Sequence, residues 1–334
     1  MKEALFYTNQ DNNTVKCELC PHLCIIPLGK TGNCKVRTNI EGKLMADNYG
    51  KISGYHLDPI EKKPLYHYYP GKSILSIGSV GCNLHCKFCQ NYEIAQSGVN
   101  SFSLKDLSSD SIVNDARRRP NNIGIAYTYN EPLVFYEFMR DTALLAKQLG
   151  LKNVMVTNGF FSPAPLERMF NFIDAFSVDL KGFTDEFYKT MTFAGLQPVK
   201  DSLIEIKKSG LHFEITNLIV PGFNDNREDF IHMLEWIQKE LGDDTILHLS
   251  RYFPRYKLTV PPTPEGEIKV LYDIASRYLK YVYMGNMESE KGQNTYCPSC
   301  NHLLVARNFY HINIDKMEQG GICSNCRQKV IEYT

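Results

Sequence analysis

Three cysteines stand close together in the stretch SVGCNLHCKFCQN, residues 79–91, and no fourth cysteine joins them. Three residues separate Cys82 from Cys86, and two separate Cys86 from Cys89. Structural zinc sites use four ligands, whereas thiolates are also the usual ligands of iron–sulfur clusters. Three thiolates on one loop can hold three irons of a 4Fe–4S cluster and leave the fourth iron open to a small molecule. We therefore expect a catalytic cluster here, rather than structural zinc or a disulfide.

The other eight cysteines form two groups, one near each end of the chain. The C-terminal group consists of CPSC and CSNC, which are two CxxC pairs at a separation typical of a zinc ribbon. We expect zinc there, with an auxiliary iron–sulfur cluster as the alternative. The N-terminal group, CELCPHLC followed by GNC, predicts a second metal site, either zinc or a redox-active cluster, with His22 as a further candidate ligand. The ligands expected at the two ends are Cys17, Cys20, Cys24, Cys34, Cys297, Cys300, Cys323 and Cys326.

The composition limits the compartment and the partners. Clustered cysteines, an odd total of 11 and no export signal at the start favour metal binding in a reducing compartment, so we expect a cytoplasmic protein. The chain has 37 basic and 37 acidic residues, which gives no broad electrostatic surface for nucleic acid or anionic lipid. No apolar run is long enough to span a membrane.

Between the cysteine groups, short β-rich runs alternate with stretches that have helical spacing of apolar residues. This alternation predicts a parallel sheet with helical crossovers, closed into a complete or partial barrel. Polar groups follow several strands (YNEP, TNG, DLK and HLSRY), and in such folds the chemistry gathers where the parallel strands end. The expected strands are 73–81, 122–129, 153–159, 175–182, 212–222, 246–253 and 281–286, and the expected helices are 104–119, 132–149, 163–173, 185–193, 199–209, 226–241 and 265–279.

Three domains are expected from the distribution of these elements. Residues 1–72 are loop-rich and hold the first cysteine group, residues 73–290 form the barrel, and residues 291–334 form the zinc-ribbon-like end. The fold class is therefore α/β, with small Cys-rich extensions that bind metal at both ends.

The loop GCNLHCKFCQN, followed in order by YNEP, TNG, DLK and VPGFND, resembles the signature of the radical S-adenosylmethionine (SAM) superfamily. Within it, the chain is similar to the pyruvate formate-lyase activating enzymes, and most similar to the radical SAM enzyme of the AmmeMemoRadiSam system. The resemblance implies a partial (βα)6 barrel and an oxidoreductase-type enzyme that reductively cleaves SAM to a 5′-deoxyadenosyl radical. It also implies a flavodoxin or ferredoxin as electron donor.

The resemblance assigns roles to individual residues. Cys82, Cys86 and Cys89 correspond to cluster ligands, and Phe88 to a residue near the adenine of SAM. Two departures are visible: YNEP lacks the glycine pair of relatives, and Val156 stands where many relatives have an aspartate that helps bind a cation. The further residues that correspond to SAM contacts are Asn130, Glu131, Asn158, Asp179, Lys181 and His248.

Each of the last three assignments has a structural alternative, and the substrate stays open. Asp179 and Lys181 can form a strand-end ion pair, and His248 can be a core histidine with its hydrogen bonds satisfied. The radical can act on a glycine of a glycyl-radical enzyme, or on another protein or small molecule with AmmeMemoRadiSam proteins as partners. A third possibility, of another class, is a zinc-ribbon scaffold on an inactive barrel.

Overall fold

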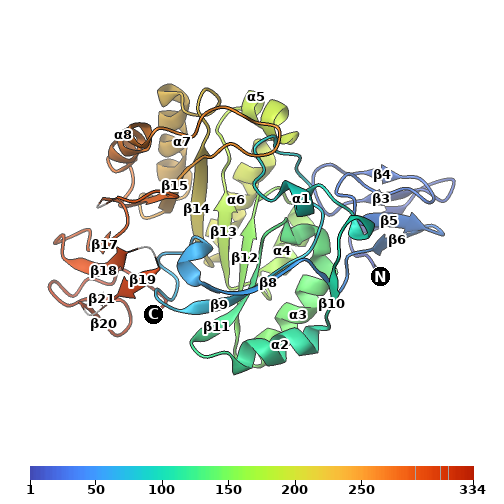
Figure 1. The fold of residues 1–334 in the computed structure, drawn as a ribbon, viewed down its shortest axis with the longest axis horizontal. Helices are drawn as coiled ribbons and strands as arrows, with labels where there is room; N and C mark the ends of the chain where they lie inside the picture. The colour runs from blue at the N-terminus through green and yellow to red at the C-terminus, as the bar shows by residue number, and fades with distance from the viewer. Residues whose placement is uncertain (290, 309, 315) are drawn as a thin grey trace.

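The computed structural model describes residues 1–289, 291–308, 310–314 and 316–334. At its centre lies an eight-stranded sheet in the order β16-β15-β14-β13-β12-β11-β9-β8, with helices packed around it (Figure 1). Every neighbouring pair is parallel except β8 and β9, which are antiparallel. The strands are β8 (Gly54–Pro59), β9 (Ser73–Gly78), β11 (Asn122–Tyr127), β12 (Lys152–Thr157), β13 (Ala175–Asp179), β14 (His212–Ile219), β15 (Ile246–Arg251) and β16 (Tyr281–Gly285).

These strands are largely apolar because both faces of the sheet are covered. In β9 and β13, nearly every residue is buried, and the runs are continuous rather than alternating. Parallel strands covered on both faces have this pattern. All seven strands expected from the sequence are confirmed, each within a few residues of its expected bounds.

The helices begin and end at the signals that the sequence contains. The side chain of Asn226 accepts hydrogen bonds from the backbone amides of Glu228 and Asp229 at the start of one helix. Gly150 and Gly242 lie just beyond two helices with φ angles of 75° and 98°, which glycine adopts without strain. The helices are α1 (Tyr92–Ala95), α2 (Ser109–Arg118), α3 (Tyr136–Gln148), α4 (Pro163–Met169), α5 (Asp185–Phe187), α6 (Gln197–Ser209), α7 (Arg227–Glu240) and α8 (Glu265–Ala275), with short helical turns η1 (Ile60–Lys62), η2 (Val99–Ser101), η3 (Pro132–Phe135) and η4 (Tyr188–Thr192).

Strands β9 to β15 and the helices that follow them make six strand–helix units, so the partial barrel is confirmed. Strand β8 was not expected. It lies inside the range 1–72, yet it pairs with β9 along its whole length, because the stretch GYHLDP packs against the edge of the barrel. The boundary expected at residue 72 therefore does not separate the N-terminal part from the barrel. The boundary expected at residue 290 lies outside the described residues.

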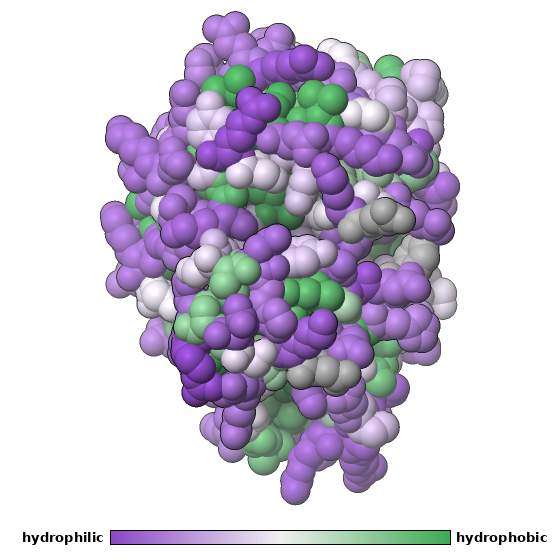
Figure 2. Space-filling view, turned by 90° about the vertical axis from the view of Figure 1, so that its left-hand side faces the viewer, coloured by the Kyte–Doolittle hydropathy of each residue, from purple (hydrophilic) through white to green (hydrophobic). Residues whose placement is uncertain are grey.

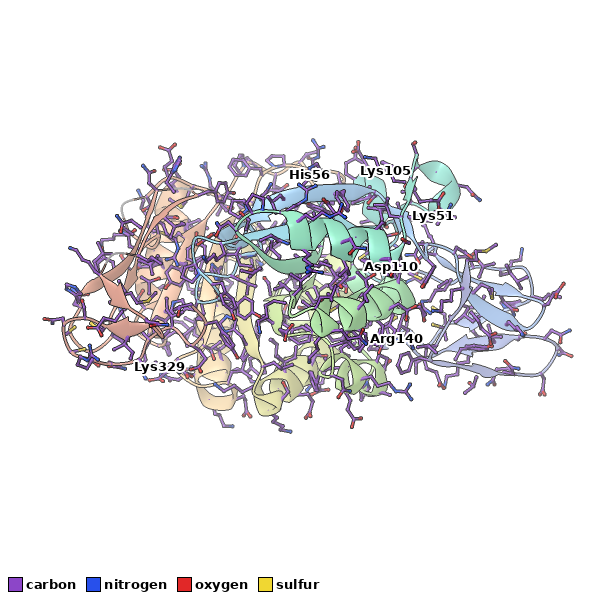
Figure 3. The ribbon with its side chains drawn as sticks, turned by 90° about the horizontal axis from the view of Figure 1, so that it is seen from below. Lys51, His56, Lys105, Asp110, Arg140 and Lys329 are labelled. Atoms are coloured by element: carbon purple, nitrogen blue, oxygen red, sulfur yellow. The ribbon has the colours of Figure 1, made fainter. Side chains whose placement is uncertain are left out.

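Small sheets flank the barrel at its two ends. Figures 1 and 3 show the N-terminal and C-terminal extensions on opposite sides of the barrel, with Lys329 in the C-terminal one. Figure 2 shows that the side with the C-terminal strands is mostly hydrophilic. The strands are β1 (Lys2–Glu3), β2 (Tyr7–Asn9), β3 (Val15–Cys17), β4 (Ile25–Ile26), β5 (Arg37–Ile40), β6 (Lys43–Ala46) and β7 (Lys51–Ile52), which pairs with β10 (Lys105–Asp106), and then β17 (Thr295–Tyr296), β18 (Leu303–Asn308), β19 (His311–Asn313), β20 (Met317–Glu318) and β21 (Ile322–Cys323).

Residues 60–72, which we call the seam segment, connect β8 to β9 and also contact the last strands of the sheet. The backbone amides of Tyr66 and His67 donate to the Glu214 carboxylate on β14, at 2.9 and 2.7 Å. The ring of His67 is 2.6 Å from the hydroxyl of Tyr283 on β16. The guanidinium of Arg307 on β18 donates to the Tyr66 carbonyl at 2.7 Å. The seam segment thus links the two edges of the incomplete barrel.

Within the described residues, each helix is too short or too polar to cross a lipid bilayer.

Candidate functional site

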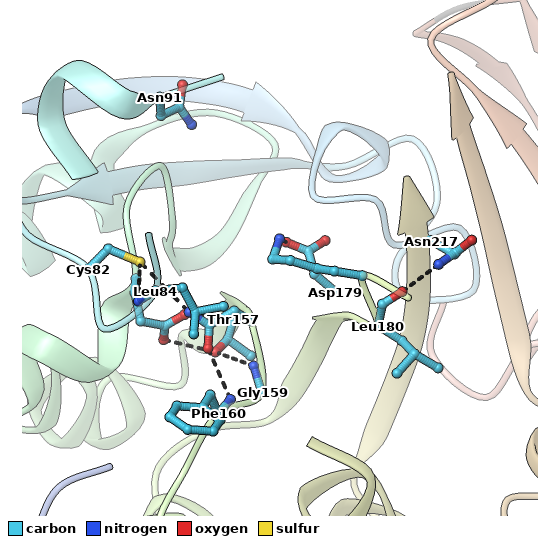
Figure 4. Close-up of polar contacts among 12 residues, drawn as sticks. Cys82, Leu84, Asn91, Thr157, Gly159, Phe160, Asp179, Leu180 and Asn217 are labelled. Carbon is cyan, nitrogen blue, oxygen red and sulfur yellow. Dashed lines mark hydrogen bonds and ion pairs between the residues drawn. The ribbon is translucent and has the colours of Figure 1, made fainter. Parts of the chain in front are cut away.

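The three-cysteine loop leaves the carboxyl end of β9 and enters a cavity of about 490 Å³. Cys82, Cys86 and Cys89 all line this cavity, together with the buried ring of Phe88. Figure 4 shows Cys82 on one side of the space and Asp179, at the end of β13, on the other. The structure therefore brings the expected cluster ligands to the end of the barrel where parallel strands place chemistry.

A glycine sets the direction in which the loop leaves the strand. Gly81 has a φ angle of 88°, and a Cβ atom there would lie 2.6 Å from the carbonyl oxygen of Cys34. Both the dihedral angle and the close approach require glycine. The loop is thereby packed directly against the N-terminal extension.

The chemistry of the three thiols fits a cluster. Burial raises the pKa of all three, to about 12 for Cys86, so their thiolates are unfavourable here without a compensating cation. Among the described residues, four cysteine sulfurs at the C-terminal end of the chain lie within 4.8 Å of one another and form a compact set. The thiols of Cys82, Cys86 and Cys89 are not part of this set. In a 4Fe–4S cluster each thiolate binds a different iron atom, so the three sulfurs can lie farther apart than the ligands of a single metal ion. The donor set thus fits a 4Fe–4S cluster with one open iron.

Asn130, of YNEP, holds the cysteine loop through its side chain. Its Oδ1 accepts from the backbone amide of Ser79 at 2.9 Å, and its Nδ2 donates to the Gly81 carbonyl at 2.8 Å. Asn130 also lines the cavity, as expected of a residue near SAM. Since both ends of its amide are occupied by the loop, the structure supports a positioning role for it.

Glu131 and Asn158 connect the second and third strand ends. The Glu131 carboxylate accepts from the Thr157 hydroxyl at 2.8 Å and from the Asn158 backbone amide at 2.9 Å, and burial raises the pKa of Glu131 to about 7. The Asn158 side chain donates to Oδ1 of Asn83 at 2.8 Å and lies 3.8 Å from the sulfur of Cys82. Both residues line the cavity, so the structure brings them beside the first cysteine.

Asp179 and Lys181 line the same cavity and pair with each other, with 2.9 Å between Nζ of Lys181 and Oδ2 of Asp179. Burial opposes the charged ammonium, but the carboxylate of Asp179 and the nearby Cys86 raise the pKa of Lys181 above its ordinary value. The ion pair that the sequence left as an alternative is present. It faces the cavity rather than bulk solvent, so it is compatible with a role in binding.

His248 lies apart from this set. Its ring is buried on β15 and is 2.6 Å from Oε2 of Glu214, beneath the seam segment. It is not among the described residues that line the cavity, and its surroundings match the alternative of a core histidine. In the register of the sheet, Glu214 pairs with Ile246 and Thr216 pairs with His248, whereas the cavity is lined by Thr216 and by Ser250, two residues beyond His248.

Sequence reasoning missed several lining residues. Lys62 and Lys63 come from the seam segment, which lies within the range expected for the N-terminal domain. The two adjacent lysines in DPIEKKP are a visible cluster of positive charge in the sequence. Their place at the cavity follows only from the pairing of the unexpected strand β8 with β9. The other missed residues with polar side chains, in or just after the later strands, are Thr216, Ser250 and Asn286.

The four N-terminal cysteines share one small cavity of about 20 Å³. It is lined by Cys17, Cys20, Cys24 and Cys34, and also by His22 and by Asn83 of the cysteine loop. Burial is the main cause that raises the pKa of Cys20 and Cys34. The structure brings together the residues that the sequence grouped, and the identity of a metal there stays a prediction.

The four C-terminal cysteines form the compact set described above. The sulfur of Cys297 is 3.5 Å from that of Cys326, and the sulfur of Cys300 is 3.6 Å from that of Cys323. Four thiolates that can reach one point suit a tetrahedral zinc ion. The structure thus supports a metal site at this end, and zinc stays the prediction for it.

A partial parallel barrel with a three-cysteine loop after its first strand defines a class of enzyme, and the comparisons agree with it. The sequence model of the radical SAM superfamily matches residues 76–237 of this chain. The chain is 43% identical to an uncharacterized protein of Methanocaldococcus jannaschii over 99% of both chains. It is 26% identical to the pyruvate formate-lyase-activating enzyme of Clostridium pasteurianum, over 45% of this chain and 63% of that relative.

Solved structures share the fold at low sequence identity. SuiB of Streptococcus suis bound to S-adenosylmethionine aligns with a TM-score of 0.53 and 11% identity, over 69% of this chain and 53% of that one. A radical SAM methyltransferase from Sphaerobacter thermophilus aligns with a TM-score of 0.50 and 14% identity, over 65% and 67%. The protein belongs to the radical SAM superfamily, whose general function is SAM cleavage at a 4Fe–4S cluster. The finer resemblance to the AmmeMemoRadiSam branch stays a prediction.

Proposed function

We propose that the protein is a radical SAM enzyme that abstracts hydrogen from a protein or small-molecule substrate. The observation that supports it most is that Cys82, Cys86 and Cys89 line one cavity with Asp179 and Lys181. When bound there, a 4Fe–4S cluster and SAM would supply a 5′-deoxyadenosyl radical through one-electron cleavage of the sulfonium, with the electron coming from a flavodoxin- or ferredoxin-class donor.

In this proposal, the chain's own residues hold, orient and shield the cofactors. The three cysteines ligate the cluster, and Asn130 and Asn158 fix the loop that carries them. The Asp179–Lys181 pair presents one ammonium and one carboxylate, which can bind the carboxylate and amine of SAM's methionine portion. The buried ring of Phe88 excludes water from the cluster side.

The two flanking cysteine groups are proposed as metal sites with structural roles. Zinc at the C-terminal group and zinc or a cluster at the N-terminal group would contribute folding free energy to extensions that have little core of their own. Free thiols of this number fit the cytoplasm, which is the location we propose.

A second candidate is activation of a glycyl-radical enzyme. It is favoured by the relatives named as pyruvate formate-lyase-activating enzymes, which match about half of this chain. An organic radical that appears in a partner only after incubation with this protein, SAM and reductant would support it.

The proposed function is tested by quantifying iron, sulfide and zinc anaerobically in the wild type and in a triple variant, Cys82→Ala with Cys86→Ala and Cys89→Ala. We expect about four irons to be lost in the variant while zinc is retained. Reductant and SAM should release 5′-deoxyadenosine from the wild type alone. Zinc without iron in the reconstituted wild type would instead favour a zinc-ribbon scaffold on an inactive barrel.

A further inference from the structure

Two lysines of the seam segment share a single carboxylate at the wall of the cavity. Nζ of Lys62 is 2.9 Å from Oδ1 of Asp58, and Nζ of Lys63 is 2.7 Å from Oδ2. Both lysines line the cavity, and the Lys63 side chain is only 2% exposed. Two ammonium groups against one carboxylate leave a surplus of one positive charge.

The arrangement around Asp58 is held by a strained tyrosine. The Tyr129 hydroxyl donates to Oδ2 of Asp58 at 2.8 Å, so this carboxylate is occupied by three donors. Tyr129 has a φ angle of 74°, and its ring fills space that a Cβ atom at Gly54 or Gly78 would occupy, at 2.6 and 2.9 Å. Left-handed backbone at a bulky residue is unfavourable and is found where the surroundings enforce it. Asp58 and the buried Lys63 are thus fixed in place, and Lys62 reaches the same carboxylate from a half-exposed position.

Other charges of the cavity do not neutralise this surplus. Asp179 and Lys181 pair with each other at 2.9 Å. Glu131 lies on the cysteine side, where the Thr157 hydroxyl and the backbone amides of Leu133 and Asn158 fill its oxygens. The surplus charge stands at the cavity wall on Lys62, whose side chain is half exposed, so a ligand that brings a negative charge to this wall is attracted to it.

A hydroxyl without a partner lies on the strands that the seam segment contacts. Thr216 of β14 lines the cavity and is 8% exposed, and its Oγ1 makes no hydrogen bond within the described part of the chain. Ser250 of β15 lines the cavity in the next layer. The seam segment contacts the same two strands through the Tyr66 amide on Glu214 and the Tyr66 ring against His248. Hydroxyl donors beside surplus positive charge suit an oxyanion.

We propose that Lys62 and Lys63, with the hydroxyl of Thr216, bind an anionic group of the substrate, a carboxylate or a phosphate. The proposal rests on the proposed function insofar as the same cavity holds the cysteines, and it names the class of substrate. It favours a small anionic molecule over the main chain of a glycine loop, because a peptide backbone has no charge to offset the surplus.

Anion binding is testable without turnover. Isothermal titration of the full chain with inorganic phosphate, and separately with malonate, is done with SAM present so that the SAM site is filled. We expect a dissociation constant of about 1–10 mM for at least one anion. Lys62→Gln, at a half-exposed position, should weaken it about tenfold, and Thr216→Val, which removes the hydroxyl at constant shape, should weaken it several-fold. The matched control is Lys105→Gln on β10, an exposed lysine outside the cavity that is labelled in Figure 3.

The outcomes separate this inference from the proposed function. Phosphate binding alone indicates a phosphorylated substrate, malonate alone a carboxylate, and both an unselective oxyanion site. Absence of binding, or equal binding in the wild type and Lys62→Gln, overturns the inference even if SAM is cleaved. Conversely, Lys62-dependent binding in a protein that cannot cleave SAM would leave the anion site standing and refute the proposed function.

Discussion

The Nε2 atom of His22 lies 2.7 Å from the carbonyl oxygen of Asn83, the residue next to Cys82. This contact joins the N-terminal cysteine group to the loop of the candidate cluster. A second bond links the two parts, between the His85 ring and Oδ1 of Asn33 at 2.9 Å. The N-terminal extension therefore braces the loop from outside the barrel.

Replacing His22 by leucine should loosen this brace. One hydrogen bond contributes about 1 kcal/mol net, so we expect the reconstituted cluster to lose iron to a chelator about fivefold faster. Iron release followed by absorbance measures this, while zinc at the C-terminal cysteines should stay unchanged. His232→Leu on α7, an exposed position, is the control. Equal rates in His22→Leu and the wild type would show that the contact does not support the loop.

Gly81→Ala should disturb the same loop from the other side. The positive φ of Gly81 disfavours a side chain, and an added Cβ atom would lie 2.6 Å from the carbonyl oxygen of Cys34. We therefore expect the free energy of unfolding to fall by about 2–4 kcal/mol. Gly210→Ala has a similar φ of 74° but open space around it, so it isolates the dihedral contribution at about 1 kcal/mol. Urea unfolding followed by circular dichroism compares the two. Equal losses would mean that the contact with Cys34 relaxes freely.

The ion pair between Arg37 and Glu137 should be important for docking the N-terminal extension. Both side chains are 1% exposed, and two hydrogen bonds of 3.1 and 2.7 Å join them. Glu137→Gln leaves a buried guanidinium without its counter-charge, which we expect to cost about 3–5 kcal/mol. Glu205→Gln, at the exposed pair with Lys208, should cost less than about 1 kcal/mol. Similar unfolding free energies for both variants would show that burial does not strengthen the contribution of the Arg37–Glu137 pair.

Cys326→Ser should remove metal from the C-terminal group alone. Cys326 is exposed, and its sulfur lies within the compact set, so the change affects the ligand more than the packing. We expect zinc in the purified chain to fall while iron at the cysteine loop is retained. Elemental analysis decides this, and parallel loss of iron and zinc would show that the two sites are not independent.

Stability should fall in mild acid because His67 cannot accept a proton in the folded chain. Burial lowers its pKa to about 3, although Glu214 favours the charged form. In the unfolded chain the imidazole titrates near pH 6.5, so between about pH 6.5 and 3 the unfolded state binds more protons. Stability is therefore present above pH 6.5 and is lost as pH falls, by about 2 kcal/mol at pH 5. Urea unfolding at pH 7 and 5 should show this loss reduced in His67→Gln, whereas His232→Gln should behave as the wild type.

The strands and the cysteine loop were predictable because their signals are local. Continuous apolar runs mark strands buried on both faces, and Gly150 marks a helix end. The placement of Glu131, Asn158, Asp179 and Lys181 around one cavity followed from a single rule, that parallel strands end at the same edge.

The missed features depend on contacts that are distant in sequence. Nothing local in GYHLDP distinguishes an antiparallel edge strand from loop, so β8 was assigned to the N-terminal domain. Its pairing with β9 is what carries Lys62 and Lys63 to the cavity. His248 illustrates the same limit, because its ring contacts Glu214 and Tyr66, which are distant in the sequence, and it does not line the cavity.

The last parallel strand, β16, and the outer strand, β8, stand at opposite ends of the strand order, with no main-chain ladder between them in the described part of the chain. Side chains of the seam segment fill that interval instead. Widening the barrel there would break contacts such as the His67–Tyr283 bond but no sheet hydrogen bonds. The barrel is therefore closed on this side by contacts of the seam segment, whereas main-chain ladders hold both sides of β9, the strand that leads into the cysteine loop.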